Sequence, residues 1–337
     1  MSNASLPVSS AADKSAAIDG TVGALLGLTW IAVTLRLYVR FYILKKLHIT
    51  DYCIILTQIF LIFQAAFIFV GVIGGIGNSN FVPTPNNIAA ALRNQLIIEL
   101  FFCIACTLLR VSIGAQLWPI INVQIASRRR QIQRFIIFSV VSIMVAFGIA
   151  WFFTLLFQCN PIQYFWNRIY ETTPGTCLSN NVEAGMAYTQ AILSAVSDFI
   201  LGLLPIWIVW DIKMPRKLKA SVAGLLGIGI SAGVVAIVRL VYTKHLIFDS
   251  NDFFGDPCPV IICAFLEVSL GVLATCIATY KPFFSQVRGK VNSYFQSHDR
   301  QAGDKHLGSK FQTTGKNAEA LQTSGIQVTR HIQVQYA

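Results

Sequence analysis

Five ionisable side chains lie inside long apolar segments of this sequence: Glu99, Arg110, Asp198, Arg239 and Glu267. A charged side chain at the centre of a bilayer costs about 2.5 to 3.5 kcal/mol on insertion scales, so each requires an oppositely charged partner or a water-filled cavity. Buried carboxylates can act as general acids or bases, and clusters of buried charge mark candidate ligand sites. These five residues are therefore the candidate functional residues.

Two of the five lie on one helical stripe. Gln95, Glu99, Cys103, Cys106 and Arg110 follow one another at intervals of four, four, three and four residues, which places them on one face of a helix. This face is expected to point into a bundle, with both cysteines as buried thiols. Because a helix rises roughly 1.5 Å per residue, Glu99 and Arg110 are about 16 Å apart, so other helices must supply their partners.

The composition indicates that membrane spans carry these residues. Hydrophobic residues make up 55% of the chain and charged residues 12%, whereas a soluble domain carries about 25% charged residues. A helix needs about 20 apolar residues to cross a bilayer. The apolar runs predict an all-α multi-pass membrane protein, with spans near residues 20–38, 51–74, 93–118, 133–157, 184–210, 219–243 and 259–279.

Lys and Arg residues predict the direction of these spans. They gather between spans one and two, three and four, and five and six, and positively charged loops remain in the cytoplasm. We therefore expect residues 1–19 outside, a seven-helix transmembrane domain over residues 20–285, and a cytoplasmic tail over residues 286–337. The tail is rich in Ser, Gln and Thr and has the composition of a disordered segment.

The basic connections account for the net charge of +11, so we expect no nucleic-acid partner. The first connection is expected to contain Arg36, Arg40, Lys45 and Lys46, and the second to contain Arg128, Arg129 and Arg130. Two interpretations stay open for these loops. They either determine topology by facing anionic lipid, or they also form a docking surface for a cytoplasmic signalling partner.

Depth in the membrane predicts two ion pairs. Arg239 lies near the outer end of span six and Glu267 roughly two turns below the outer end of span seven, so we expect them to pair. Glu99 is expected to lie close enough to share this pair, and Asp198 and Arg110 to form a second pair deeper in the bundle. These residues either fix the helices together or line an outward-opening pocket for a ligand or for proton chemistry.

The outer side carries two predicted modifications. Cys159 and Cys177 bracket the connection between spans four and five, which would face an oxidising compartment, so we expect a disulfide bridge there. Cys258 is a competing partner. Asn3 begins an Asn-Ala-Ser sequon and is a predicted glycosylation site. No spacing in the sequence points to a metal site.

Several motifs resemble the fungal rhodopsin-domain family, which includes Pth-eleven-like receptors and satratoxin-cluster membrane proteins. They are Leu35-Arg36-Leu37-Tyr38-Val39-Arg40 before Asp51-Tyr52, Cys159-Asn160-Pro161 with Gly175-Thr176-Cys177, Asp198 before Leu204-Pro205-Ile206, Arg239, and Glu267 before Lys281-Pro282-Phe283-Phe284. The resemblance covers about residues 20–285. Thr50 and Arg110 depart from the family pattern, which usually has an acidic residue and a Lys at these positions. The resemblance implies either a role in secondary metabolism or a surface receptor.

Four classes of function follow from these residues. Retinal requires a Lys in the seventh span, which has none, so no cofactor is expected. We favour a membrane protein of a secondary-metabolite pathway, in the plasma membrane or an endomembrane, with a G-protein-coupled-receptor-like sensor as the alternative. A cofactor-free cyclase or isomerase, using Glu99, Asp198 and Glu267 on an apolar small molecule, and a metabolite transporter also stay open.

Overall fold

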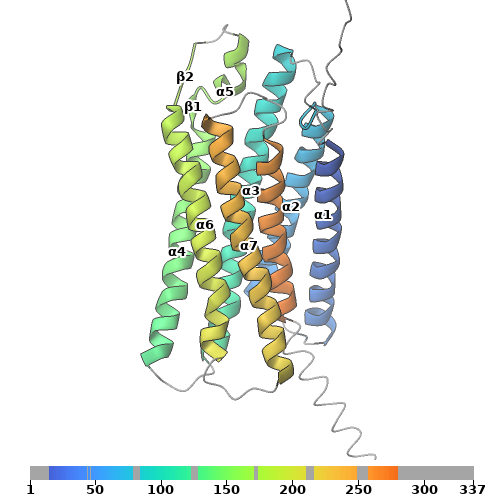
Figure 1. Cartoon of the computed structure of the whole chain (residues 1–337), viewed down its shortest axis with the longest axis vertical. Coiled ribbons are helices and arrows are strands. Elements are labelled where there is room, and N and C mark those ends of the chain that lie inside the picture. Colours follow the sequence, from blue (N-terminus) through green and yellow to red (C-terminus); the bar gives the residue numbers. More distant parts are fainter. Residues whose placement is uncertain are drawn as a thin grey trace, which may run out of the picture. The chain divides into compact units, whose positions relative to one another are not determined.

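The computed structural model describes residues 15–43, 45, 47–78, 84–122, 128–170, 174–209, 216–248 and 257–279. Within these residues, seven helices are long and apolar enough to cross a membrane. They stand side by side in one bundle (Figure 1). The predicted all-α, seven-helix architecture is confirmed. Asn3 and the tail over residues 286–337 lie outside the described residues, so their predicted glycosylation and disorder stay predictions.

The spans correspond to the predicted apolar runs, but each helix begins before its predicted run, and the third and sixth also end beyond theirs. The first four are α1 (Ser15–Tyr38), α2 (Ile49–Ile73), α3 (Pro85–Asn122) and α4 (Arg128–Leu156). The fifth and sixth are α6 (Asn180–Val209) and α7 (Arg216–Phe248). The seventh span is the helix Cys258–Thr279. The apolar runs predict only the lipid-facing length, whereas a helix continues into the polar interface as long as its backbone hydrogen bonds are satisfied.

A compact connection links α4 to α6. It contains β1 (Cys159–Asn160), α5 (Tyr164–Asn167), the 3₁₀ turn η2 (Arg168–Tyr170) and β2 (Thr176–Cys177). The two strands pair antiparallel with Cys159 opposite Cys177, and the predicted Cys159–Cys177 disulfide is present. We call this end of the bundle the disulfide end and the opposite end, where Arg36 lies, the Arg36 end.

The centre of the bundle is formed by α3 and the seventh span, which are the two most buried of the seven helices. Phe102 of α3 and Phe265 of the seventh span are fully buried, and they belong to the same core cluster as Leu61 of α2. Elsewhere the helices approach closely. A Cβ on Gly229 of α7 would lie 3.2 Å from the Cα of Gly202 in α6, so small residues are needed at this crossing.

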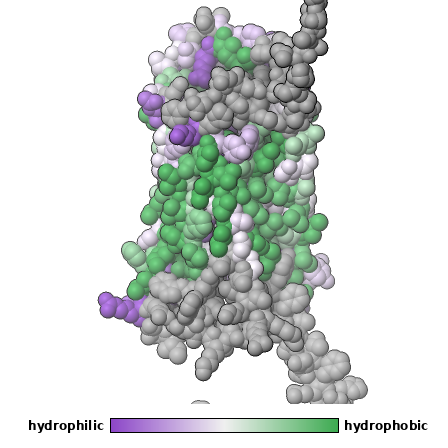
Figure 2. Space-filling view, viewed as in Figure 1, coloured by the Kyte–Doolittle hydropathy of each residue, from purple (hydrophilic) through white to green (hydrophobic). Residues whose placement is uncertain are grey.

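The outer surface of the bundle is suited to lipid. Large apolar side chains such as Ile73 and Phe135, which are 85% and 71% exposed, point away from the core. Figure 2 shows hydrophobic side chains over the middle of the visible face, with hydrophilic side chains nearer its ends. A band of this kind matches the hydrocarbon layer of a bilayer, and the chain is therefore a multi-pass membrane protein.

Two predictions about the basic connections are wrong. Arg36 is expected in a loop, but α1 continues to Tyr38 and as the π-helical turn η1 (Val39–Ile43), so Arg36 lies inside a helix and is fully buried. Arg128, Arg129 and Arg130 are also expected in a loop, but they form the first turn of α4. In both cases polar residues continue a helix beyond its apolar stretch.

Candidate functional site

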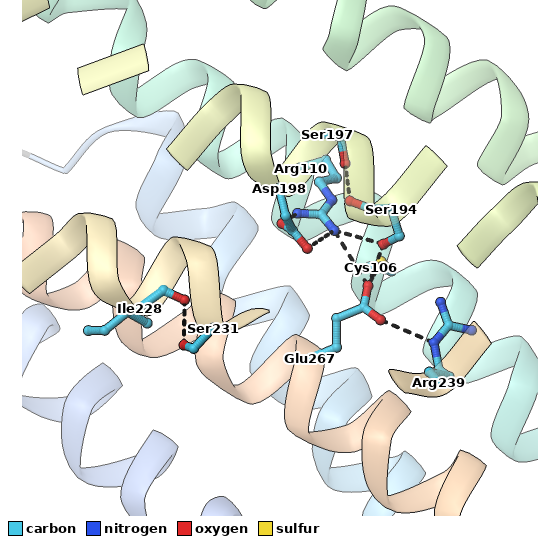
Figure 3. A network of polar contacts seen from close by, with 9 residues as sticks. All are labelled: Cys106, Arg110, Ser194, Ser197, Asp198, Ile228, Ser231, Arg239 and Glu267. Carbon is cyan, nitrogen blue, oxygen red and sulfur yellow. Dashed lines mark hydrogen bonds and ion pairs between the residues drawn. The ribbon is translucent and has the colours of Figure 1, made fainter. Parts of the chain in front are cut away.

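The predicted ion pairs are both present in the interior of the bundle. Arg239 Nε of α7 lies 3.2 Å from Glu267 Oε2 of the seventh span. Arg110 of α3 pairs with Asp198 of α6, and its Nη2 lies 3.0 Å from Asp198 Oδ2. All four side chains are buried. Figure 3 shows them pointing toward one another from four different helices.

The two pairs form one network, which the sequence does not predict. Arg110 Nη2 lies 3.5 Å from Glu267 Oε1, and it also donates to Ser194 Oγ at 2.8 Å. The Ser194 hydroxyl in turn donates to Glu267 Oε1. Ser194 therefore connects the Asp198 pair to the Arg239 pair. We call these five residues, Arg110, Ser194, Asp198, Arg239 and Glu267, the ionic network.

Ser194 is not among the residues predicted from the sequence, although its spacing from Asp198 could have indicated it. Ser194 precedes Asp198 by four residues in α6, and residues at this spacing share one helical face. A Ser on the same face as a buried Asp is a candidate for a shared partner. The sequence cannot show that the shared partner is Arg110 of α3.

A cavity of about 340 Å³ lies at the disulfide end, between α3, α4, α6, α7, the seventh span and the α4–α6 connection. Its polar lining residues are Gln95, Glu99, Gln158, Arg168, Glu183, Gln190, Arg239 and Thr243. Its apolar lining residues are Leu96, Trp151, Leu155, Phe165, Ala184, Ala187 and Val260. We call it the outer cavity, after the predicted position of this end. Small-molecule sites typically have a volume of about 300 to 1,000 Å³, with mostly apolar walls and a few convergent polar groups.

Several polar atoms in the wall of the outer cavity are buried and have no hydrogen-bond partner. They are Gln95 Oε1, Trp151 Nε1, Gln190 Oε1 and Arg239 Nη2. Trp151, Gln190 and Arg239 are 2%, 3% and 4% exposed, so bulk water does not reach them freely. Leaving a buried polar group unsatisfied costs about 1 to 3 kcal/mol. Four such atoms in one cavity are the strongest sign of a binding site in the described part of the chain.

Arg239 connects the outer cavity to the ionic network. Its Nε faces Glu267, its guanidinium carbon lies 4.9 Å from the centre of the Phe102 ring, and its Nη2 remains unpartnered in the cavity wall. The ion pair and the ring contact hold the guanidinium in one orientation. The two N–H donors of Nη2 are therefore available to an acceptor in the cavity.

Glu99 lies in the wall of the outer cavity. It interacts electrostatically with Arg239 and Glu267, as expected from its depth. The indole N–H of Trp151 lies next to the Glu99 carboxylate but without the geometry of a hydrogen bond. The helical stripe of α3 is thus divided. Its upper residues Gln95 and Glu99 line the cavity, and Arg110 lies in the network below.

The cysteines on this stripe are buried thiols, as predicted. Cys103 Sγ donates to the Gly148 carbonyl at 3.3 Å, and Cys106 Sγ donates to Glu267 Oε1 at 3.9 Å. Cys258 does not take part in the Cys159–Cys177 bridge. Among the described residues, no group of three His, Cys, Asp or Glu side chains could hold a metal ion.

The α4–α6 connection covers the outer cavity. Arg168 of η2 lies 5.2 Å over the Phe165 ring of α5, and both residues line the cavity. Tyr170 donates to Asn86 of α3 at 2.6 Å, which ties the connection to the beginning of α3. The disulfide closes the base of this connection. The described part of the connection therefore forms one wall of the cavity and is tied to itself by the disulfide and to α3 by Tyr170.

A further buried ion pair, separate from the ionic network, lies at the Arg36 end. Arg36 Nε donates to Asp51 Oδ1 at 3.0 Å, and its Nη1 donates to the Thr275 carbonyl at 2.6 Å. Asp51 Oδ2 also accepts from the His48 backbone N–H at 3.0 Å, which caps α2. These contacts join α1, α2 and the seventh span. The residues come from the Leu35–Arg40 and Asp51 motifs, and in this structure their role is to hold helices together.

The family model of the fungal rhodopsin domain matches residues 35–286. A SAT4 family membrane protein of Emericella nidulans is 29% identical over 168 residues, which are 50% of this chain and 40% of that protein. Satratoxin biosynthesis SC1 cluster protein 4 of Stachybotrys chartarum is 25% identical over 134 residues, 40% of this chain and 46% of the relative.

A further relative is fugralins biosynthesis cluster protein 2 of Gibberella zeae, which is 26% identical over 120 residues, 36% of this chain and 28% of the relative. The matched segments span less than half of each of these relatives. No solved structure is detectably similar to the chain. The family match nevertheless covers most of the seven-helix bundle, and the chain belongs to the fungal rhodopsin-domain family of membrane proteins.

Proposed function

We propose that this protein binds a small, largely apolar molecule in the outer cavity and acts as a membrane component of a secondary-metabolite pathway. Two of the similar proteins are named for the biosynthesis clusters of satratoxin and fugralins. The size of the cavity and its mixture of apolar walls and polar groups fit a metabolite of this kind.

The observation that carries the proposal is the concentration of unpartnered polar atoms in the cavity wall. Buried Gln side chains with an unpartnered oxygen also occur elsewhere, at Gln58 and Gln64 of α2. The outer cavity differs because four such atoms from four helices line one space. A ligand with a few polar substituents would satisfy them together, which gives both affinity and orientation.

The predicted topology places the outer cavity on the extracellular or lumenal side, in the plasma membrane or an endomembrane. A ligand would then enter from outside the cytoplasm or from the outer leaflet. The seventh span contains no Lys, so we propose that the ligand is held without a Schiff base and that no retinal is bound.

A second candidate function is that of a sensor with a cytoplasmic signalling partner. Arg239 favours it, because this one side chain belongs to both the outer cavity and the ionic network. A ligand acceptor on Arg239 Nη2 would alter the contacts of Glu267 with Arg110 and Ser194. Such a change could move α3, α6, α7 and the seventh span relative to one another.

Native mass spectrometry of the protein purified from fungal membranes tests for a bound ligand. We expect a small-molecule adduct on the wild type and a clear loss of it in Gln190→Leu, which removes an acceptor from the cavity wall. Gln64→Leu is the matched control, because Gln64 is also buried and unpartnered but lies outside the cavity. An adduct that both variants retain equally, or no adduct in any of them, would contradict binding in the outer cavity.

Metabolite profiling of a deletion strain separates the two candidate functions. If the protein serves the pathway, deletion causes one intermediate to accumulate, and the Gln190→Leu gene fails to restore the wild-type profile while Gln64→Leu restores it. An unchanged profile combined with a lost response to an external cue would favour the sensor.

A further inference from the structure

We infer that the ligand of the outer cavity carries one positive charge, as a protonated amine, and presents it to Glu99. This inference rests on the proposed function, since it names the chemical class of the molecule that the cavity binds.

The interior of the bundle around the cavity contains more carboxylates than guanidinium groups. Within the ionic network, Arg110 pairs with Asp198 and Arg239 pairs with Glu267. Glu99 lies above these two pairs, in the cavity wall. At the rim, Arg168 and Glu183 interact with each other and add one charge of each sign. Glu99 is therefore the surplus carboxylate.

A surplus charge is costly at this position. Arg239 is shared between Glu267 and Glu99, and its direct ion pair is with Glu267. In a medium of low dielectric constant, a carboxylate without its own counter-charge either takes up a proton or requires a cation beside it. A cationic ligand would supply the missing charge from the cavity side, whereas a ligand carboxylate would lie against Glu99 and Glu183 in the cavity wall.

The acceptors in the wall match the donors of an ammonium group. Gln95 and Glu99 lie one helical turn apart on α3, and Gln190 faces the same cavity from α6. Gln95 Oε1 and Gln190 Oε1 are buried and unpartnered. Together with the Glu99 carboxylate they offer three acceptors, and an ammonium group has three N–H donors. These oxygens show that the cavity is a built site and not an acidic cluster alone.

The remaining wall groups define the rest of the ligand. Arg239 Nη2 is an unpartnered donor, so it would face a hydroxyl, ether or carbonyl oxygen. Leu96, Leu155 and Val260 supply apolar surface for a carbon skeleton. The ligand class is thus a compact, apolar amine that also carries an oxygen acceptor. A lipid ethanolamine headgroup fits less well, because its phosphate would be repelled by the surplus carboxylate.

A fragment screen in matched sets tests this inference. Each set holds one carbon skeleton bearing an amine, a hydroxyl or a carboxylate, and binding is measured by ligand-observed NMR on the full chain in phosphatidylcholine nanodiscs, which contain no lipid primary amine. Fragments that bind less well to Gln190→Leu than to Gln64→Leu are assigned to the outer cavity. Among these, we expect amines to bind at least about tenfold more tightly than the matching alcohols, and carboxylates not to bind.

The same fragment screen on the Glu99→Gln variant tests the role of the Glu99 charge. This variant removes the surplus charge but keeps the size of the side chain, so the amine preference should fall to about the level of the alcohols while alcohol binding persists. The inference is wrong if the wild type binds amines and alcohols equally well, or if Glu99→Gln keeps the amine preference. Neither result would contradict the proposed binding site itself. If no fragment class depends on Gln190, the proposed binding site itself fails.

Discussion

The ionic network shows how individual side chains share charge inside this bundle. Arg239 faces two carboxylates, Glu267 and Glu99, while Arg110 faces Asp198 and Glu267. Removing one charge from such a cluster does not simply delete one pair. Its effect depends on the charge balance of the residues that remain.

This balance predicts an asymmetry between two substitutions. Arg239→Gln leaves Asp198 and Glu267 sharing Arg110 and leaves Glu99 without its arginine, and we expect it to lower the free energy of unfolding by about 3 to 5 kcal/mol. Glu267→Gln leaves Asp198 and Glu99 with one arginine each, so its effect should be smaller by at least about 1 kcal/mol. Thermal unfolding of both variants in the same detergent is the measurement. Equal losses, or a larger loss in Glu267→Gln, would contradict the charge count.

A reciprocal charge swap is not expected to restore stability. An arginine at position 267 would lie next to Arg110, which is 3.5 Å from Glu267 in the wild type. A glutamate at position 239 would lie near Glu99. The double variant Arg239→Glu with Glu267→Arg should therefore be at least as unstable as Arg239→Gln, and a restored thermal midpoint would show that Arg239 and Glu267 act as an isolated pair.

Arg36 illustrates the value of a planar guanidinium at the Arg36 end. It reaches Asp51, the Thr275 carbonyl and Thr50 with different nitrogens, which a single ammonium group cannot do. We expect Arg36→Lys to lower the free energy of unfolding by about 1 to 3 kcal/mol. Arg40→Lys is the control, since Arg40 is partly exposed and lies 3.7 Å from Asp51, and it should change stability little. Comparable losses in the two variants would contradict the role of Arg36.

At the scale of elements, the α4–α6 connection depends on a close approach of its two halves. A Cβ on Gly175, which precedes β2, would lie 2.3 Å from Cγ of Tyr164 in α5. The two residues could not keep their positions, and the cover of the outer cavity would shift. Tyr164 is followed directly by Phe165, which lines the cavity.

Gly175→Ala should therefore disturb the cover and reduce stability by about 1 to 3 kcal/mol, and it should weaken ligand binding. Gly185→Ala is a suitable control, because a Cβ there meets no atom within 4 Å and Gly185 lies in helix α6. Thermal unfolding and the fragment assay together measure the effect. If Gly175→Ala and Gly185→Ala have the same thermal stability and the same fragment binding, the close approach of Gly175 to Tyr164 does not matter for the cover of the cavity.

The elements were largely predictable from the sequence, because seven apolar runs dominate the pattern of the chain. Helix ends were less predictable. The sequence predicts loops at Arg36 and Arg128 because charge usually marks the end of an apolar run. A helix can nevertheless continue when its polar side chains find partners or reach the interface. The Cys159–Cys177 bridge followed from its position between two spans.

The site was predictable only in part. The pairs Arg239–Glu267 and Arg110–Asp198 followed from depth in the membrane. Their connection through Ser194 did not, because it depends on how α3, α6 and the seventh span are rotated about their axes. An outward-opening pocket is one of the two predicted alternatives, and Glu99 and Arg239 do line the outer cavity. The rest of its lining could not be predicted, since its walls come from five spans and from the folded connection between α4 and α6.

For the whole molecule, the direction of the chain in the membrane is still a prediction. We expect the disulfide end outside and the Arg36 end in the cytoplasm, because basic residues gather near the latter. In membranes of intact cells, a tag at the C-terminus should resist protease until the cells are permeabilised. A glycan at Asn3, removed by Asn3→Gln, should be visible as a shift in mobility. A C-terminal tag that is cleaved in intact cells would contradict this topology.

An experimental density map of the outer cavity, from protein purified out of fungal membranes, would test the proposed binding site most directly. We predict non-protein density within hydrogen-bond distance of Gln190 Oε1 and Arg239 Nη2, enclosed by the α4–α6 connection. The same map from Gln190→Leu should show this density reduced or absent. A wild-type cavity without density, closed by side chains that satisfy Gln190 and Arg239 within the protein, would contradict a binding site at this position.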